Sequence, residues 1–211
     1  MKISVTITKS KYNIIDTLNR LNETDADFLH LDVMDGIFVS NILYPYPEVK
    51  EFIIYNKKPI DVHLMVFDVK KYINQFVNIN PEYITFHLEV NDNIEELINY
   101  IHSFNIKVGL SIKPTTSISE IIKYLPYIEQ VLVMSVEPGF GGQKFLNEVL
   151  PKIALLRELK AQNNYQYLIS VDGGINEDTA KLLNDADILS VGSYVCMNDN
   201  YQAQINKLRP E

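Results

Sequence analysis

Cysteine is almost missing from this 211-residue sequence, which contains only Cys196, so an intramolecular disulfide framework is excluded. The sequence has no run near the ~20 consecutive apolar residues of a membrane helix, and its first residues lack the apolar core of a signal peptide. Lys and Arg number 19 against 27 Asp and Glu, and the formal net charge of −8 argues against nucleic acid as the main partner. These absences predict a cytoplasmic protein that binds neither nucleic acid nor a membrane.

The sequence does have a regular alternation of short β-rich runs with longer helical ones. Strands are expected at residues 3–7, 28–33, 60–66, 83–88, 107–112, 131–135, 167–171 and 188–191. Helices are expected at residues 10–22, 47–55, 68–78, 92–104, 117–124, 145–162, 176–185 and 199–208. These repeats predict parallel βαβ units in one α/β domain spanning residues 1–211. An open doubly wound sheet would alternate in the same way, but the eightfold count and the polar residues described next favour a (β/α)8 TIM barrel.

Polar side chains occur late in several of these strands. In the run from Phe28 to Val33, the two-residue period of a strand places His30 and Asp32 on one face and the apolar residues on the other. The apolar face of a barrel strand packs on the helices, so the polar face is expected to point into the barrel near its C-terminal mouth. His63 and Asp172 occupy similar late positions in their own strands. Barrel enzymes have their active sites at this mouth.

Two imidazoles and two carboxylates that converge at one barrel mouth form a plausible site for a divalent cation. Nitrogen and oxygen ligands together suit Zn²⁺, Fe²⁺, Mn²⁺ or Co²⁺ better than Ca²⁺. Taken singly, each of these residues is explained equally well as an ordinary buried polar side chain with a backbone partner. Four uncompensated polar groups at the same mouth would be costly, which favours the metal site.

Glycine is scarce, with 8 residues in the chain, and six of them follow three successive expected strands. Glycine permits positive φ and close backbone approach, so that successive N–H groups can surround an anion. Loops after the last strands of a barrel commonly bind phosphate, whereas the alternative is a set of turn glycines without a ligand. The six glycines are Gly139, Gly141, Gly142, Gly173, Gly174 and Gly192.

Three methionines, Met34, Met65 and Met134, each stand at the end of an expected strand. Methionine at such a position normally fills the core, because its side chain is flexible and apolar. The alternative is an apolar, polarizable floor beneath a substrate.

Other polar residues near the expected mouth have two interpretations each. Asp35 is either an acceptor that orients a metal ligand or a turn residue before Gly36. His87 and Glu89, which close the strand expected at 83–88, either support the site or have a structural role. His102 is expected on a helix surface, facing solvent.

Five segments carry a more specific signal when they are taken together. They are LHLDVMDG (29–36), DVHLMV (61–66), ITFHLE (84–89), VMSVEPGFGGQKF (133–145) and VDGGIN (171–176). In this order, over almost the whole chain, they closely resemble the ribulose-phosphate 3-epimerase family. The resemblance implies a TIM barrel with one divalent metal ion, a homo-oligomer, and interconversion of D-ribulose 5-phosphate and D-xylulose 5-phosphate in the pentose phosphate pathway.

The matching motif positions imply roles for individual residues. The metal ligands would be His30, Asp32, His63 and Asp172, with Zn²⁺ or Fe²⁺ as the first choice of ion. The acid/base pair would be Asp32 and Asp172. The sugar phosphate would contact Thr6, His63, Gly139, Phe140, Gly141, Gly142, Gly173, Gly174, Gly192 and Ser193, over a floor of Met34, Met65 and Met134. Inversion at C3 of a 2-ketose requires removal of a proton from one face and return of one to the other, which two opposed carboxylates can perform through a 2,3-enediolate.

Departures from the family pattern lie in the first strand and in loops around the mouth. Thr6 stands where serine is usual, Ile37 and Ser40 replace a common histidine and proline, and Lys113 replaces an asparagine. None of these changes removes an expected ligand, but they leave open another ketose phosphate, such as allulose 6-phosphate, as the substrate.

Two further alternatives belong to other classes of protein. A metal-free phosphate-binding barrel such as a decarboxylase would need a D-x-K-x-x-D strand, and this sequence has Asp32 at the place of the lysine. A non-catalytic barrel that binds a phosphate ligand also stays open, because a fold does not fix a function.

Overall fold

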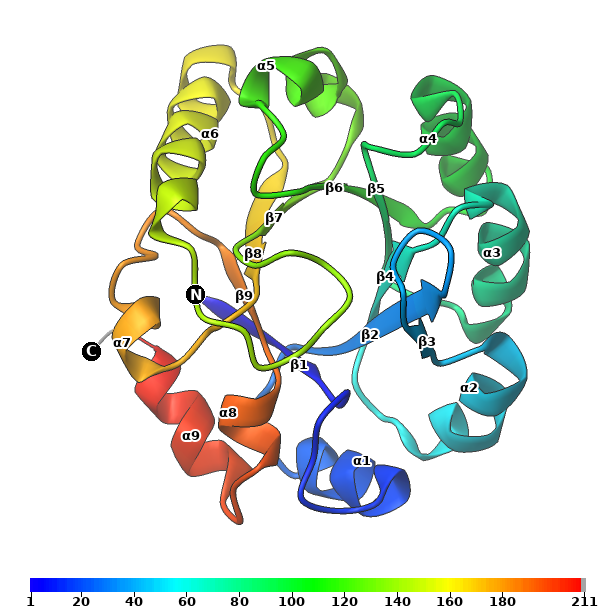
Figure 1. The fold of residues 1–211 in the computed structure, drawn as a ribbon, viewed down its shortest axis with the longest axis vertical. Helices are drawn as coiled ribbons and strands as arrows, with labels where there is room; N and C mark the ends of the chain where they lie inside the picture. The colour runs from blue at the N-terminus through cyan, green and yellow to red at the C-terminus, as the bar shows by residue number, and fades with distance from the viewer. Residues whose placement is uncertain (210–211) are drawn as a thin grey trace.

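A closed ring of parallel strands forms the centre of the molecule, and helices surround it (Figure 1). The computed structural model describes residues 1–209, so the predicted domain of residues 1–211 ends two residues outside the described range. The strands in that range are β1 (Lys2–Thr6), β2 (Phe28–Asp35), β3 (Ile42–Leu43), β4 (Ile60–Met65), β5 (Tyr83–His87), β6 (Lys107–Ile112), β7 (Gln130–Met134), β8 (Leu168–Asp172) and β9 (Ile188–Val191).

The pairing of these strands closes the sheet on itself. Neighbouring strands follow the order β1-β9-β8-β7-β6-β5-β4-β2, all in parallel, and β2 also pairs with β1. The short strand β3 is added outside this ring, antiparallel to β2. Within residues 1–209 the ring therefore contains eight parallel strands, which confirms the predicted (β/α)8 barrel.

The α-helices follow the strands in alternation along the chain. Most of them begin at a residue whose side-chain oxygen accepts a backbone N–H of the first turn, as Asn13, Asp68, Asn93 and Asn200 do. The helices are α1 (Ile14–Asn22), α2 (Tyr46–Phe52), α3 (Val69–Phe76), α4 (Ile94–His102), α5 (Ile118–Ile121), α6 (Leu150–Asn163), α7 (Glu177–Ala180), α8 (Ser193–Cys196) and α9 (Tyr201–Leu208). None of those in the described range combines the length and apolar character that a membrane crossing needs.

The hydrophobic core lies between the barrel wall and the helices. On β2, the side chains of Leu29, Leu31 and Val33 are fully buried in this layer, while His30 and Asp32 take the alternate positions inside the barrel. The parallel register then sets Asp32 opposite His63 on β4. The two-residue period therefore places the polar residues where the sequence predicted them.

Several element boundaries differ from the sequence prediction. The helix expected at 176–185 ends at Ala180, and the chain continues with turn bonds from Leu182 N to Thr179 O and from Leu183 N to Ala180 O. The segment expected as helix at 117–124 is helical only to Ile121 and then tightens into a 3₁₀ helix that contains Pro126. Neither β3 nor α8 was expected, because two- and four-residue elements have too few residues to show a period.

The carboxylate of Asp187 joins α6 to the barrel wall. It accepts hydrogen bonds from Arg157 Nη2 at 2.7 Å, Lys160 Nζ at 3.3 Å and the backbone N–H of Ile169 at 2.9 Å. Burial raises the pKa of Asp187, but the hydrogen bonds from Arg157 and Ile169 and the charge of Lys160 outweigh it and hold this pKa below its usual value. A carboxylate whose pKa is lower in the folded state than in the unfolded state stabilises the fold at pH values above its unfolded-state pKa. This contribution is lost as the pH falls through the folded-state pKa.

We therefore expect Asp187→Asn to lower the free energy of unfolding by about 1–2 kcal/mol at pH 7. The difference from the unmutated protein should shrink at about pH 3, below the ordinary pKa of an aspartate. Urea unfolding at both pH values checks this expectation. Asp185→Asn is the matched control, because the exposed carboxylate of Asp185 makes none of these three contacts. An equal loss of stability at both pH values would contradict the electrostatic explanation.

Candidate active site

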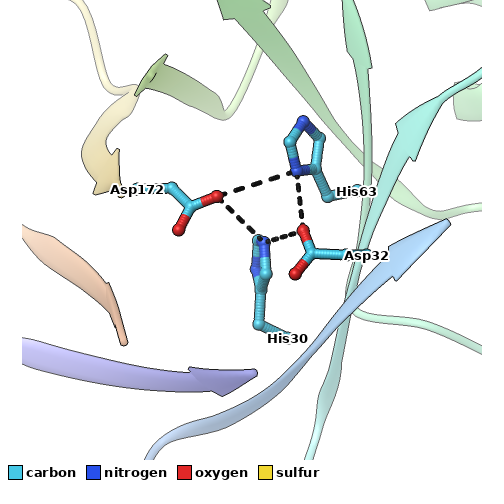
Figure 2. A group of neighbouring side chains, drawn as sticks. All are labelled: His30, Asp32, His63 and Asp172. Atoms are coloured by element: carbon cyan, nitrogen blue, oxygen red, sulfur yellow. Dashed lines mark hydrogen bonds and ion pairs between the residues drawn. The ribbon is translucent and has the colours of Figure 1, made fainter. Parts of the chain in front are cut away.

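Four side chains converge at the mouth of the barrel, and we call them the His/Asp cluster (His30, Asp32, His63 and Asp172; Figure 2). His30 and Asp32 come from β2, His63 from β4 and Asp172 from the end of β8. Asp32 Oδ1 lies 3.2 Å from His30 Nε2 and 3.1 Å from His63 Nδ1. Asp172 Oδ2 lies 3.9 Å and 4.0 Å from the same two nitrogens. The four residues predicted as one site are thus brought together.

The donor atoms of the His/Asp cluster fit a metal ion. One ligand atom from each residue lies within 4.8 Å of all the others. His30 Nε2 is buried without a hydrogen-bond partner, while its other ring nitrogen contacts Asp61 Oδ2 at 2.9 Å. A buried nitrogen without a partner is costly unless some group satisfies it, and a cation between the two imidazoles and two carboxylates would do so. The group could therefore hold a metal ion, which agrees with the sequence prediction.

The two carboxylates of the cluster have clearly separated acidities. Burial raises the pKa of Asp172 to about 6, and the neighbouring charge of Asp32 adds to the effect. Burial acts on Asp32 in the same sense, but the charge of His30 outweighs it and holds the pKa of Asp32 well below its usual value. Titratable pairs whose environments push their pKa values apart are typical of acid/base catalysis.

Asp32 and Asp172 form part of the wall of a cavity of about 430 Å³. This volume is within the range of small-molecule sites. The hydroxyl of Thr6 lines the same cavity and donates to Asp32 Oδ2 at 2.8 Å. The predicted floor residues also line it, and each is nearly buried: Met34, Met65 and Met134.

The glycine segments after β7, β8 and β9 line this cavity too. The loop between β7 and α6 crosses the opening of the barrel (Figure 1). It packs against Gly174, whose φ is +66° and where a Cβ would come within 2.5 Å of the backbone nitrogen of Phe145. Glycine is required there for both reasons. All the predicted loop contacts lie along this wall: Gly139, Phe140, Gly141, Gly142, Gly173, Gly174, Gly192 and Ser193.

The surroundings of three further residues bear on the sequence predictions. Asp35 is a turn residue, since its Oδ1 accepts the N–H groups of Ile37 and Phe38 at 2.8 and 2.9 Å and, within the described residues, contacts no nitrogen of the His/Asp cluster. Phe140 is 56% exposed, and its neighbours Gly141 and Gly142 are exposed as well, so this part of the loop is open to solvent. His63, expected to touch both metal and substrate, is fully buried behind the cavity wall, and its substrate contact stays a prediction.

Sequence reasoning missed two residues near the site, Asp61 and Lys9. Asp61 holds the ring of His30, and its position two residues before His63 on the same strand was the available signal. His87, for which support of the site was one of two interpretations, contacts His63 directly, at 2.9 Å between the two Nε2 atoms. Lys9 lines the cavity from the loop after β1, where no periodicity could have placed it.

A closed barrel with a buried His/Asp cluster at the C-terminal mouth and a glycine-walled cavity beside it defines a class of barrel enzyme that works on small molecules. The family model described as the ribulose-phosphate 3-epimerase family matches residues 2–196. The chain belongs to the ribulose-phosphate 3-epimerase family, which confirms the resemblance seen in the sequence and places the chain among isomerases.

Three of the relatives match at 35%, 37% and 39% identity. Ribulose-phosphate 3-epimerase of Aquifex aeolicus is 39% identical over 87% of this chain and 84% of its own. The Mycobacterium tuberculosis enzyme of the same name is 37% identical over 87% and 81%. The enzyme of that name from Methanocaldococcus jannaschii is 35% identical over 99% and 90%.

More distant solved structures share the fold. KGPDC from Streptococcus mutans superposes with a TM-score of 0.68 at 15% identity, covering 98% of this chain and 94% of its own. Phosphoribosyl anthranilate isomerase from Thermococcus kodakaraensis gives a TM-score of 0.67 at 13% identity, covering 100% and 99%. At these identities the likeness supports the barrel alone.

Proposed function

We propose that this protein catalyses the metal-dependent 3-epimerisation of D-ribulose 5-phosphate to D-xylulose 5-phosphate. The observation that carries the proposal is the pair of buried carboxylates, Asp32 and Asp172, in one cluster with two imidazoles beside a cavity walled by glycine loops. Family membership supports the same reaction, because the relatives are named for it.

In this proposal Asp32 and Asp172 act as the acid/base pair. One carboxylate removes the C3 proton and the other delivers a proton to the opposite face, with their roles exchanged in the reverse direction. The raised pKa of Asp172, about 6, and the low pKa of Asp32 suit an acid and a base that work as a pair. Ser135 keeps Asp172 in place, since its Oγ donates to the backbone carbonyls of Asp172 and Gly173 at 2.8 and 2.7 Å.

The remaining residues would bind and position the substrate. A divalent ion held by His30, Asp32, His63 and Asp172 would supply Lewis-acid stabilisation of the negative charge that develops on the 2,3-enediolate. Zn²⁺ and Fe²⁺ are the first choices for this mixed nitrogen and oxygen set, with Mn²⁺ and Co²⁺ as alternatives. Backbone N–H groups of the glycine loops would hold the phosphate away from the reacting carbon and fix its position.

Deuterium incorporation tests the proposed reaction directly. The purified protein is incubated with ribulose 5-phosphate in D₂O, with and without a chelator, and C3 is followed by NMR. We expect chelator-sensitive incorporation at C3 together with the appearance of xylulose 5-phosphate. Absence of exchange in the metal-replete protein would overturn the pentulose assignment, and allulose 6-phosphate is the next substrate to test. Failure with both would favour a non-catalytic barrel.

Lys9 is the only cationic side chain among the cavity-lining residues of the described range, and its Nζ lies 3.8 Å from the position of a Cβ built on Gly142. We expect Lys9→Met to raise KM for the phosphorylated substrate about tenfold with little change in kcat. The reason is that the ammonium group of Lys9 would contact the non-reacting phosphate and so stabilise the bound substrate and the transition state equally. Steady-state kinetics measure this split. Lys11→Met is the matched control, since Lys11 pairs with Asp199 at 2.6 Å on the surface. A KM within twofold of the unmutated value would exclude this role of Lys9.

The oligomeric state stays a prediction from the family resemblance, and the compartment stays one from composition. We propose a homo-oligomer, which light scattering coupled to size-exclusion chromatography would test.

A further inference from the structure

A continuous hydrogen-bonded chain runs from the His/Asp cluster to a carboxylate beyond it. His63 Nε2 lies 2.9 Å from His87 Nε2, and His87 Nδ1 lies 3.2 Å from Glu89 Oε2. Both imidazoles are fully buried. We call these three residues the His63–His87–Glu89 chain.

The far end of this chain is fixed by donors from another loop. Glu89 Oε1 accepts the backbone N–H of Lys113 at 2.7 Å and the hydroxyl of Thr116. The ring of Phe38 packs on the ring of His87, with centroids 4.8 Å apart, and Lys113 Nζ lies over the ring of Phe38, 4.4 Å from its centroid. The two imidazoles are therefore enclosed, and the carboxylate of Glu89, whose side chain is 20% exposed, is anchored by its donors.

Hydrogen-bond counting fixes where the protons lie along the chain. Glu89 already accepts two donors at Oε1, and its Oε2 accepts from the N–H at His87 Nδ1. A neutral imidazole that donates at Nδ1 must accept at Nε2. The single proton between the two Nε2 atoms then belongs to His63. His63 Nδ1 is left with a lone pair 3.1 Å from the acceptor Asp32 Oδ1, an arrangement that a cation held by both atoms would stabilise.

The geometry points to a positioning role for His87 and Glu89: they hold His63 in the tautomer and orientation in which Nδ1 binds the metal ion. This inference rests on the metal dependence in the proposed function. His30 has the corresponding support from Asp61 at its Nδ1 and would bind through Nε2. The two imidazole ligands thus use opposite nitrogens, one supported by a carboxylate directly and the other through an intervening histidine.

Glu89→Gln tests the inference with almost no change in shape. The single carbonyl oxygen of glutamine can keep the donors Lys113 N–H and Thr116, which turns the amide NH₂ toward His87 Nδ1. That contact favours the tautomer of His87 that accepts at Nδ1 and donates from Nε2. His63 Nε2 must then accept, so the proton of His63 moves to Nδ1, the nitrogen through which it would bind the metal ion. Loss of such an outer partner typically weakens metal affinity 10–100-fold, and we expect a loss of this size for Zn²⁺ measured by chelator competition without substrate.

Glu129→Gln is the matched control. Glu129 also pairs with a histidine, His102 Nε2 at 3.0 Å, and also accepts a backbone N–H, that of Val108 at 2.8 Å, but it lies on the outside of the barrel. We expect its Zn²⁺ affinity to equal that of the unmutated protein. Thermal unfolding of the metal-free variants separates a loss of folding from a loss of the site.

The tautomer can be measured independently of affinity. Long-range ¹H–¹⁵N spectra of the Zn²⁺-loaded protein should show the proton of His63 on Nε2, and His87→Gln should weaken Zn²⁺ binding to a similar extent as Glu89→Gln. Unchanged affinity in both variants, or a proton on His63 Nδ1 in the unmutated protein, would overturn the inference while leaving the epimerase proposal intact. Failure of the unmutated protein to bind any divalent ion would overturn it as well, and C3 exchange in D₂O then decides the epimerase proposal separately.

Discussion

Asp172→Asn is expected to abolish net epimerisation, with a loss of about 10²–10⁴-fold or more in kcat. The side chain keeps its size, and Ser135 still donates to the backbone carbonyls of residues 172 and 173, so the local structure should be retained. What is lost is a titratable group whose pKa, about 6, suits proton transfer near neutrality. Asp32→Asn should reduce turnover at least as much, because Asp32 contacts both imidazoles of the His/Asp cluster.

A two-base mechanism makes a sharper prediction for Asp172→Asn. The remaining carboxylate, Asp32, can still remove and return a proton on its own face of C3. We therefore expect the variant to exchange deuterium into one of the two epimers without converting it into the other. NMR in D₂O, starting separately from each pentulose phosphate, measures this. Substantial epimerisation by either variant would contradict the assignment of two bases.

Removal of divalent metal is expected to have a comparably large effect. Dialysis against a chelator should bring turnover to the detection limit, and addition of Zn²⁺, Fe²⁺, Mn²⁺ or Co²⁺ should restore it to different extents. Binding at 100 times Kd also stabilises the folded protein by about 2.7 kcal/mol, so the chelated protein should unfold at a lower temperature.

Metal analysis provides the control for this experiment. The restored protein should contain one ion per chain, and the loss of that ion should parallel the loss of turnover. Full activity in protein shown to be metal-free would exclude a metal-dependent reaction at the His/Asp cluster.

The strand period was sufficient to predict where the cluster lies. On β2, alternation alone separates His30 and Asp32 from the apolar residues that pack on the helices, and the structure has the same separation. Closure of the barrel brings β8 near β2, so the late position of Asp172 in its strand predicts that it lies at the same mouth. These predictions rest on periodicity and topology, which a sequence carries directly.

Contacts between side chains on neighbouring strands were harder to predict. The meeting of His63 with His87 depends on the register of β4 against β5, in which His63 lies opposite Thr85 and His87 follows two residues later on the same face. Register between strands is set by the packing of the whole barrel. Lys9 and the two-residue strand β3 depend on loop conformations, which have no period at all.

Closure of the ring between β1 and β9 also determines when the site can form. Asp172 on β8 reaches His30 on β2 only when the last strand of the barrel pairs with the first. Synthesis proceeds from the N-terminus at about 5–20 residues per second, so the cluster cannot assemble until residues 188–191 have left the ribosome. Before that point a chain could offer at most the cluster residues of β2 and β4, so a metal ion bound as proposed by all four residues would favour the completed barrel over partly folded forms.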